Sequence, residues 1–228
     1  MKPPIAQEEN LLIGGISAAD LVKQFGSPLY VYDAEAIKSR CRIFQSALQG
    51  IPHKIHYACK ANSNLRLMAL IRSQGYGVDA VSRGEIMACK KAGFQTDEIT
   101  FTGNNVTAED LAWIHDQGIT MILDSVDQVR RLGDLRPGTS IGLRLNITGA
   151  GHHEHVITGG EGSKFGIISA DVPTALETAS RRRLKVVGVH QHIGSGILDV
   201  DLWMECFNQF LVAAEAIDDL EWVDGGGG

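Results

Sequence analysis

The sequence predicts an α/β protein of the (β/α)8-barrel class that ends before its last strand. Three observations predict this fold. Short β-prone runs alternate with longer segments of helical periodicity, helix-capping residues follow several of those runs, and polar residues gather where the runs end. Strands that alternate with helices form a parallel sheet through right-handed crossovers. A barrel of this kind takes about 250 residues, and this chain has 228.

Seven β-prone runs are predicted to form the parallel strands. They are, in order, residues 54–59, 77–81, 99–102, 120–124, 140–146, 185–192 and 221–224. An open doubly wound sheet would also fit the alternation, but polar residues at the C-terminal end of almost every strand favour the barrel. The seventh run leads directly into Gly225–Gly228, where the sequence ends. We therefore expect the chain to be a fragment of a longer protein.

The segments between the strands carry helical signals. Apolar residues recur every three or four positions in residues 64–73 and 207–217. Ser82, Thr107 and Ser125 each stand three positions before Glu, Asp or Gln, which predicts capping boxes directly after a strand. Three glycines are predicted to end helices in the left-handed conformation: Gly75, Gly93 and Gly118.

The chain is predicted to have two parts. Residues 1–34 form an N-terminal segment with one strand at 29–32, and residues 35–228 form the incomplete barrel. The stretch 146–165 is the one long irregular segment and is rich in Gly and His. Long loops within compact domains are usually functional or mobile.

Composition argues against several partners. The formal net charge is −6, and the basic run Arg181–Arg183 is too short to indicate a nucleic-acid interface. No apolar run reaches the roughly 18 residues of a membrane helix, and the polar first ten residues lack the apolar run of a secretory signal. Four cysteines without a C-x-x-C pair fit a reducing, cytoplasmic setting with free thiols.

Lys60 is the first candidate for chemistry. It directly follows the mostly apolar strand at residues 54–59. A lysine that emerges from a barrel wall is expected to be partly desolvated, which favours the neutral amine, a nucleophile for carbonyl groups. The alternative is an ordinary surface lysine at the end of a strand.

Two glycine-containing turns are candidates for binding a phosphate. Ser195 lies between two glycines and offers a hydroxyl beside free backbone amides, and the glycines at 225–228 allow close approach of N–H groups. The alternative for the second turn is a flexible or engineered tail. His190 and His192 precede the first turn and lie on the same side of their strand.

A zinc site is the competing interpretation of the His-x-His pair. The cluster at residues 152–155 could supply further imidazoles. No cysteine or acidic residue stands at a spacing that completes a tetrahedral shell, so no metal is predicted. Asp79 and Arg144 interrupt apolar strands, where a charge is costly unless it is paired. Both are expected to face the barrel interior and to belong to one polar network.

Taken together, these motifs resemble the fold-type III, alanine racemase-like, pyridoxal-phosphate-dependent decarboxylases. The resemblance spans residues 28–228 and is carried by segments 28–33, 57–62, 77–85, 101–105, 123–125, 143–146, 163–167, 190–195 and 224–228. Within that family, Phe-Thr-Gly-Asn-Asn at 101–105 and the loop from His152 to Ile167 are similar to bacterial diaminopimelate decarboxylases. Ornithine and arginine decarboxylases differ in those two segments.

The resemblance implies pyridoxal 5'-phosphate as the cofactor. Lys60 would hold its aldehyde as a Schiff base, His192 would stack on its ring, and Asp79 would orient Lys60. Arg144 would belong to the same cofactor site, and the loop from His152 to Lys164 would lie near the active site. The phosphate would be bound by Ser195, Gly226, Gly227 and Gly228.

The activity implied is decarboxylation of meso-diaminopimelate to L-lysine and CO2. Alternatives are an ornithine, arginine or related decarboxylase, a non-catalytic pyridoxal-phosphate carrier, an alanine racemase relative, and a metal hydrolase. Full-length members resemble homodimers and continue past the glycine run. An acidic partner for the pyridine nitrogen and a C-terminal β-domain are expected there. The strand at residues 29–32 would pair with that β-domain, so it has nothing to pair with in this chain. We therefore expect the 228-residue chain alone to be almost inactive.

Overall fold

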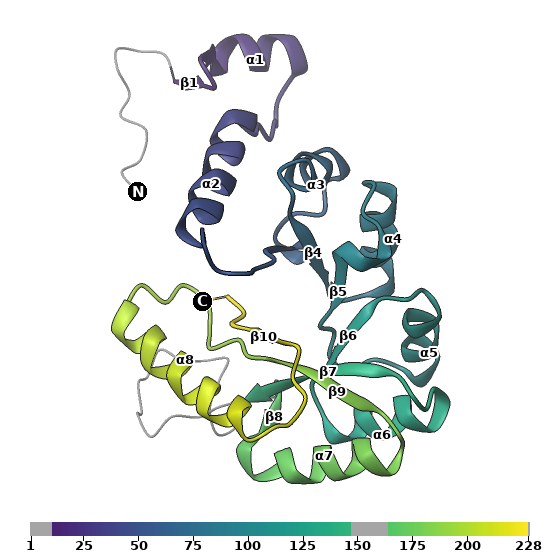
Figure 1. The fold of residues 1–228 in the computed structure, drawn as a ribbon. Coiled ribbons are helices and arrows are strands. Elements are labelled where there is room, and N and C mark those ends of the chain that lie inside the picture. Colours follow the sequence, from purple (N-terminus) through teal and green to yellow (C-terminus); the bar gives the residue numbers. More distant parts are fainter. Residues whose placement is uncertain (1–10, 147–163, 228) are drawn as a thin grey trace.

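A computed structural model describes residues 11–146 and 164–227 of the chain. Its main sheet has the strand order β10-β9-β7-β6-β5-β4-β3, with β8 beside β7, and neighbouring strands run parallel (Figure 1). Helices α4, α5, α6 and α7 follow one another along the outer side of this sheet. The prediction of seven parallel strands in an incomplete α/β barrel is confirmed.

The seven predicted strands of the barrel are all present, but most are shorter than expected. The sheet contains β3 (His56–Ala58), β4 (Gly77–Ala80), β5 (Ile99–Phe101), β6 (Thr120–Leu123), β7 (Ser140–Asn146), β8 (Ile167–Ile168), β9 (Lys185–His190) and β10 (Trp222–Asp224). The two-residue β8 was not predicted. It continues the pairing with β7 at Leu145 and Asn146, beyond the point where β7 pairs with β9.

Most helices, with the exception of α1 and α7, begin after a residue whose side chain accepts a hydrogen bond from the N–H groups of the first turn. They are α1 (Ala18–Phe25), α2 (Ala34–Ala47), α3 (Leu65–Arg72), α4 (Arg83–Lys91), α5 (Ala108–Asp116), α6 (Val126–Leu135), α7 (Val172–Arg181) and α8 (Val200–Glu215), with short 3-10 turns η1 (Cys59–Ala61), η2 (Thr96–Glu98) and η3 (Ser169–Asp171). Helix α8 begins before the periodic segment at 207–217, because Asp199 accepts the N–H groups of Asp201 and Leu202.

The predicted capping boxes are only half formed. Ser82 and Ser125 each accept an N–H bond from the third helical residue, as expected. The returning side chain, however, bonds the residue before the cap: Glu85 accepts the Val81 N–H at 2.8 Å. Gln128 likewise accepts the Asp124 N–H at 3.1 Å. These two N–H groups lie just past the end of a strand and need an acceptor.

The hydrophobic core lies between the sheet and its helices. Outward-facing strand residues such as Val78 and Ala80 are fully buried there, together with Ile86 of α4 and Leu111 of α5. A smaller cluster joins α2 to α3 through Cys41, Ile71 and Tyr76. All four cysteines are free thiols, as predicted. No helix in the described residues is long and apolar enough to span a membrane.

An apolar layer covers the inner face of β6, β7, β9 and β10, on the side of the polar residues nearer the N-terminal ends of these strands. Trp222, Gly188, Gly142 and Ile122 are cross-strand neighbours on β10, β9, β7 and β6. The Trp222 ring lies so close to the glycines that a Cβ at Gly188 would be 2.1 Å from it and one at Gly142 would be 2.5 Å from it. Glycine is therefore required at both positions for the indole to fit.

Replacing Trp222 by alanine should remove most of the side-chain volume that packs over Gly188 and Gly142. Because Trp222 is partly buried, we expect the change to cost about 2 kcal/mol of unfolding free energy, less than for a fully buried aromatic side chain. Val223→Ala is the matched control, because Val223 faces outward and is 46% exposed. Urea unfolding followed by circular dichroism measures both changes. A W222A variant as stable as V223A would show that the indole is not part of the core.

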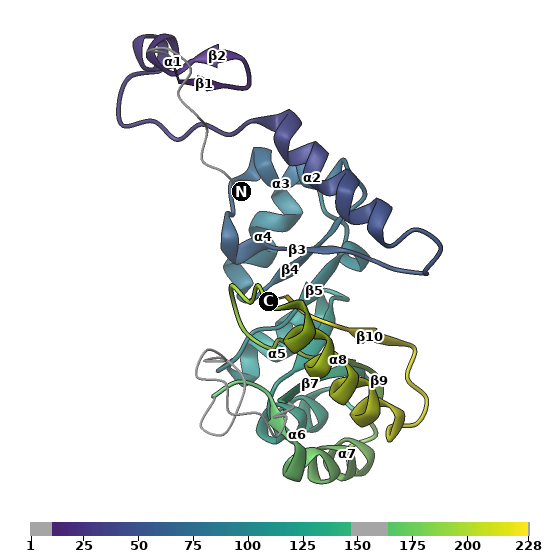
Figure 2. The same cartoon turned by 90° about the vertical axis from the view of Figure 1, so that its left-hand side faces the viewer.

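Residues 29–32 were expected to form a strand only by pairing with a C-terminal β-domain, and that pairing stays a prediction. Residues 29–32 adopt no strand, and Tyr30 is 87% exposed. An isolated extended segment has no partner for its backbone groups, and no strand among residues 11–146 and 164–227 runs beside it. The N-terminal segment instead forms the hairpin β1 (Leu12–Ile13) and β2 (Ile16–Ser17), followed by α1. This unit lies away from the barrel, at the far end of α2 (Figure 2).

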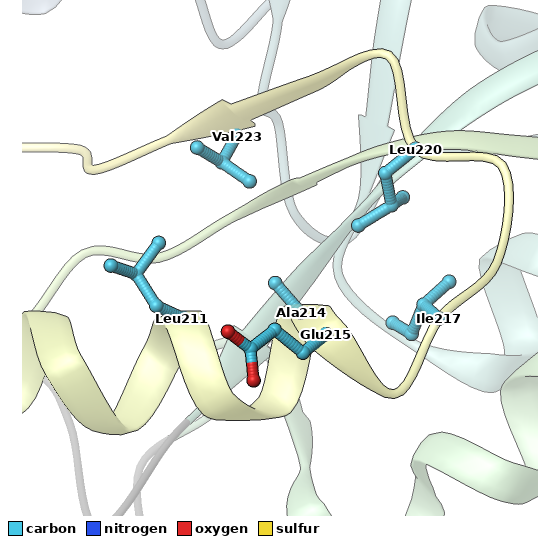
Figure 3. A pocket seen from close by; sticks show the side chains of 6 residues that line it. All are labelled: Leu211, Ala214, Glu215, Ile217, Leu220 and Val223. Carbon is cyan, nitrogen blue, oxygen red and sulfur yellow. The ribbon is translucent and has the colours of Figure 1, made fainter.

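An apolar groove runs along the outer side of β10. It has a volume of about 360 Å³ and lies between β10 and α8 (Figure 3). Its lining consists of Leu211, Ala214, Glu215, Ile217, Leu220 and Val223. Since these residues face away from the barrel interior, the groove is separate from the polar residues described next.

Candidate functional site

A polar layer lies directly above the apolar layer, towards the C-terminal ends of the strands. It consists of Asp79, Thr102, Asp124, Arg144, His190 and Asp224. Arg144, His190 and Asp224 are cross-strand neighbours on β7, β9 and β10. They stand two residues beyond Gly142, Gly188 and Trp222, so they share the inner face of the sheet. The expected polar network of the barrel interior is therefore present.

The two end strands of the sheet face each other across this layer. The carboxylate of Asp224 on β10 acts on the imidazole of His56 on β3 and raises its pKa, although burial lowers that pKa overall. Asp224 also raises the pKa of Asp79 on β4. The sheet thus curls far enough to bring side chains of its first two strands and its last strand into one electrostatic environment.

Asp79 carries a carboxyl group that burial makes difficult to ionise. Burial raises its pKa from 3.8 to about 6, against the lowering effect of a hydrogen bond from Thr102 Oγ1 to Asp79 Oδ1 at 2.7 Å. The Asp224 carboxylate raises the pKa further, and the Lys60 ammonium lowers it. Asp79 and Lys60 are therefore close enough to interact, as the predicted role of Asp79 requires.

The raised pKa of Asp79 gives a prediction about stability and pH. Between about pH 4 and pH 6 the folded chain keeps a proton on Asp79 that the unfolded chain has lost, so the unfolding free energy should fall as pH rises through this window. Asp79→Asn removes this penalty and keeps an acceptor for Thr102. We expect D79N to be more stable than wild type at pH 7.5 by on the order of 2 kcal/mol, and equally stable near pH 4. Urea titrations at both pH values would contradict this if wild type were the more stable at pH 7.5.

Arg144 is the buried cation of the layer. It is only 9% exposed, and its guanidinium lies 5.0 Å from the ring centre of Phe165. Burial lowers its pKa, while the carboxylates of Asp124 and Asp79 raise it. Asp124 in turn accepts a 2.6 Å hydrogen bond from Asn104 Nδ2. Arg144 therefore offsets part of the negative charge of the buried acids Asp79 and Asp124.

Lys60 lies in η1, directly after β3, where the sequence places it. Its side chain is exposed, so the predicted partial desolvation is not found. Lys60 lies in the 3-10 turn that follows β3, so it is no longer part of the sheet. The ammonium still acts on Asp79, His190 and His192, lowering the pKa of each. Lys60 thus stands over the polar layer with its amine accessible.

His192 and the glycine turn after β10 contact each other directly. The N–H of Gly227 donates to His192 Nδ1 at 3.3 Å, and the N–H of Gly226 donates to Asp224 Oδ1 at 2.8 Å. Gly226 has a positive φ of 67°, and a Cβ there would lie 1.9 Å from the Gln191 carbonyl oxygen. Burial lowers the pKa of the half-buried His192, so its imidazole is neutral near pH 7. The two predicted parts of the site are therefore adjacent.

Ser195 lies in the turn that follows His192. It is exposed and stands between Gly194 and Gly196, which both have positive φ. Its hydroxyl makes no hydrogen bond within residues 11–146 and 164–227, so it is available to a ligand. Gly228 and the loop from His152 lie outside the described residues. Within the described ranges, no three His, Cys, Asp or Glu side chains are grouped to hold a metal ion.

Thr102, Asp124 and Asp224 of the polar layer were not singled out from the sequence, and His190 was considered only beside His192 as half of a His-x-His pair. Each could have been found from the alternation of strand residues. Positions two apart share a face, so Asp224 follows the inward Trp222, and His190 precedes the inward His192. Whether such residues meet depends on the curl and stagger of the strands, which the alternation does not give.

Comparison with known proteins supports the family resemblance that the sequence motifs indicate. Residues 34–228 match the model of the pyridoxal-dependent decarboxylase family, in its pyridoxal-binding domain. Diaminopimelate decarboxylase of Methanothermobacter thermautotrophicus is 41% identical over 228 residues, and that of Escherichia coli K12 is 38% identical over 213 residues. The crystal structure of diaminopimelate decarboxylase from Helicobacter pylori, complexed with L-lysine, has a TM-score of 0.84 at 29% identity.

These matches cover most of this chain but only part of each relative. The alignments cover 96% and 91% of the chain and 53% and 50% of the two relatives. The Helicobacter pylori structure is matched over 92% of this chain and 56% of that one. The chain thus spans about half the length of the curated relatives it matches.

Proposed function

The chain belongs to the pyridoxal-dependent decarboxylase family, and from this premise we propose that its barrel binds pyridoxal 5'-phosphate and serves the decarboxylation of meso-diaminopimelate to L-lysine. The observation that carries the proposal is the grouping of an accessible lysine, a neutral imidazole and a glycine turn at one end of the barrel. The names of the two curated relatives support diaminopimelate as the substrate.

The residues present fit this cofactor. Lys60 offers an exposed primary amine that could hold an aldehyde. Gly226 lies so close to the Gln191 carbonyl that no Cβ fits there, and the free Ser195 hydroxyl is a donor for a phosphate. Ser195 and the turn Gly226, Gly227 and Gly228 would bind the phosphate group. The N–H groups of Gly226 and Gly227 already bond Asp224 and His192, so these two glycines would contribute the shape of the turn. When bound, pyridoxal phosphate withdraws electrons from the substrate carbon that loses CO2.

The side chains around Lys60 would each have a separate task. His192 is neutral and receives the Gly227 N–H, so its ring is held against the turn and could stack on an aromatic ligand. Asp79 would orient the Lys60 amine through their mutual attraction. Arg144 would offset part of the negative charge of Asp79 and Asp124 beneath the ligand. In the full-length protein, a homodimer would complete the active site.

Cofactor binding and substrate choice can be tested separately. Purified chain is titrated with pyridoxal phosphate, its absorbance spectrum is recorded, and the adduct is trapped with borohydride and located by peptide mass mapping. We expect one adduct, on Lys60. Adding meso-diaminopimelate should then change the spectrum at lower concentration than L-ornithine does. An adduct confined to other lysines would disprove the cofactor site, and a stronger response to L-ornithine would disprove only the substrate.

A further inference from the structure

We propose that His190 is a further ligand-binding residue of this site, an imidazole in the barrel interior that hydrogen-bonds the bound pyridoxal phosphate. The inference rests on the proposed function, because the ligand is the same cofactor. It adds a residue to which neither the family resemblance nor the comparisons assign a role.

The position of His190 points to the site. It is the last residue of β9 and lies between Arg144 and Asp224 in register, on the inner face of the sheet. It is two residues before His192, so both imidazoles face the interior. Lys60, Arg144 and His192 all act electrostatically on the His190 ring. His190 therefore lies within electrostatic reach of Lys60, the proposed cofactor lysine.

The hydrogen bonding of His190 is incomplete. The side chain is 7% exposed, and its Nδ1 atom is buried without a hydrogen-bond partner in the described chain. A buried polar atom of this kind costs free energy comparable to a lost hydrogen bond. His56, on the opposite side of the barrel, shows the contrast, because its Nδ1 is 2.7 Å from Thr100 Oγ1. His190 thus has a buried hydrogen-bonding atom without a partner, on the strand face that also carries Arg144 and Asp224.

Burial and the nearby positive charge of Arg144 keep the His190 imidazole neutral. Burial, and then the positive charge of Arg144, lower its pKa from 6.5 to about 3. A neutral imidazole has one N–H donor and one acceptor nitrogen. It can therefore bond a hydroxyl or a ring substituent of a polar aromatic ligand without adding a charge beside Arg144 and Lys60. A leucine there would remove the unsatisfied atom and would leave the apo protein no worse packed.

The test compares three variants of the whole chain. His190→Leu removes both nitrogens, whereas His190→Asn keeps a polar atom close to the position of Nδ1. His56→Leu is the matched control, because His56 is also an interior histidine but already has a partner. Two quantities are measured for each variant: the dissociation constant for pyridoxal phosphate by absorbance titration, and the urea midpoint of the apo protein.

We expect H190L to raise the dissociation constant about tenfold, the equivalent of one hydrogen bond. Its urea midpoint should equal or exceed that of wild type. H190N should restore most of the affinity, and H56L should lower the urea midpoint with little effect on affinity.

Three results would overturn the inference. Equal affinity of H190L and wild type would show that His190 does not bind the cofactor, while leaving the proposed function intact. A lower urea midpoint for H190L, with no rescue of affinity by H190N, would make His190 a structural residue. Failure of wild type itself to bind pyridoxal phosphate would refute the proposed function and this role together.

Discussion

Replacing Lys60 by alanine should eliminate the borohydride-trapped cofactor adduct. Lys60 carries the accessible amine above the polar layer, and its attachment to the cofactor is the main covalent contribution expected of the site. We expect the affinity for pyridoxal phosphate to fall by about 100-fold or more, which corresponds to about 3 kcal/mol. Peptide mass mapping after reduction, together with an absorbance titration, measures both effects.

The matched control for this prediction is Lys54→Ala. Lys54 is also an exposed lysine, but it lies just before β3, at the opposite end of the strand from Lys60. We expect its adduct yield and affinity to match wild type. Because both lysines are exposed, each substitution should change the unfolding free energy by no more than about 0.5 kcal/mol. Retention of the adduct in K60A would show that another lysine holds the cofactor.

Replacing Gly226 by alanine should distort the glycine turn. Its φ of 67° is unfavourable for a residue with a side chain, and a Cβ would lie 1.9 Å from the Gln191 carbonyl oxygen. The turn must therefore move away from β9, which would break the bond from the Gly227 N–H to His192 Nδ1. We expect about a tenfold loss of affinity for pyridoxal phosphate and a loss of roughly 1 kcal/mol in unfolding free energy.

Gly227→Ala provides the comparison within the same turn. A Cβ at Gly227 would come no closer than 3.9 Å to the His192 ring, an ordinary van der Waals contact. We therefore expect wild-type stability and an affinity within about threefold of wild type, since little strain is introduced. Should G226A and G227A bind pyridoxal phosphate equally well, the shape of the turn would not matter for binding.

Several features of the fold followed from local sequence. The strand at 140–146 was predicted with its observed bounds, because apolar residues and a single charged position lie between a turn and a loop. Gly75, Gly93 and Gly118 all adopt positive φ after a helix, as their positions indicated. Ser82, Thr107 and Ser125 all cap helices through their hydroxyls. These features depend on interactions within a few residues, so the sequence alone contains them.

Features that depend on distant partners were predicted less well. Residues 29–32 have β-prone composition but lack a neighbouring strand, so they form none. The short β8 exists only because the end of β7 offers free backbone groups to Ile167 and Ile168. The start of α8 was missed for another reason. Val200, Trp203 and Phe207 already have helical spacing, and Asp199 is a local N-cap signal that the prediction overlooked.

The candidate site shows the same division between sequence and tertiary structure. Sequence motifs identified Lys60, Asp79, Arg144 and His192 as residues of one site. Alternation along the strands predicted that Asp79 and Arg144 face the interior, and it left open whether His192 faces inward or outward. Only the curl of the sheet determined that Asp224 at one end acts on His56 and Asp79 at the other. Only the packing of the barrel exposed Lys60 and left His190 Nδ1 without a partner. Sequence specifies side-chain chemistry and local direction, whereas burial and pairing arise when strands far apart in the chain are brought together.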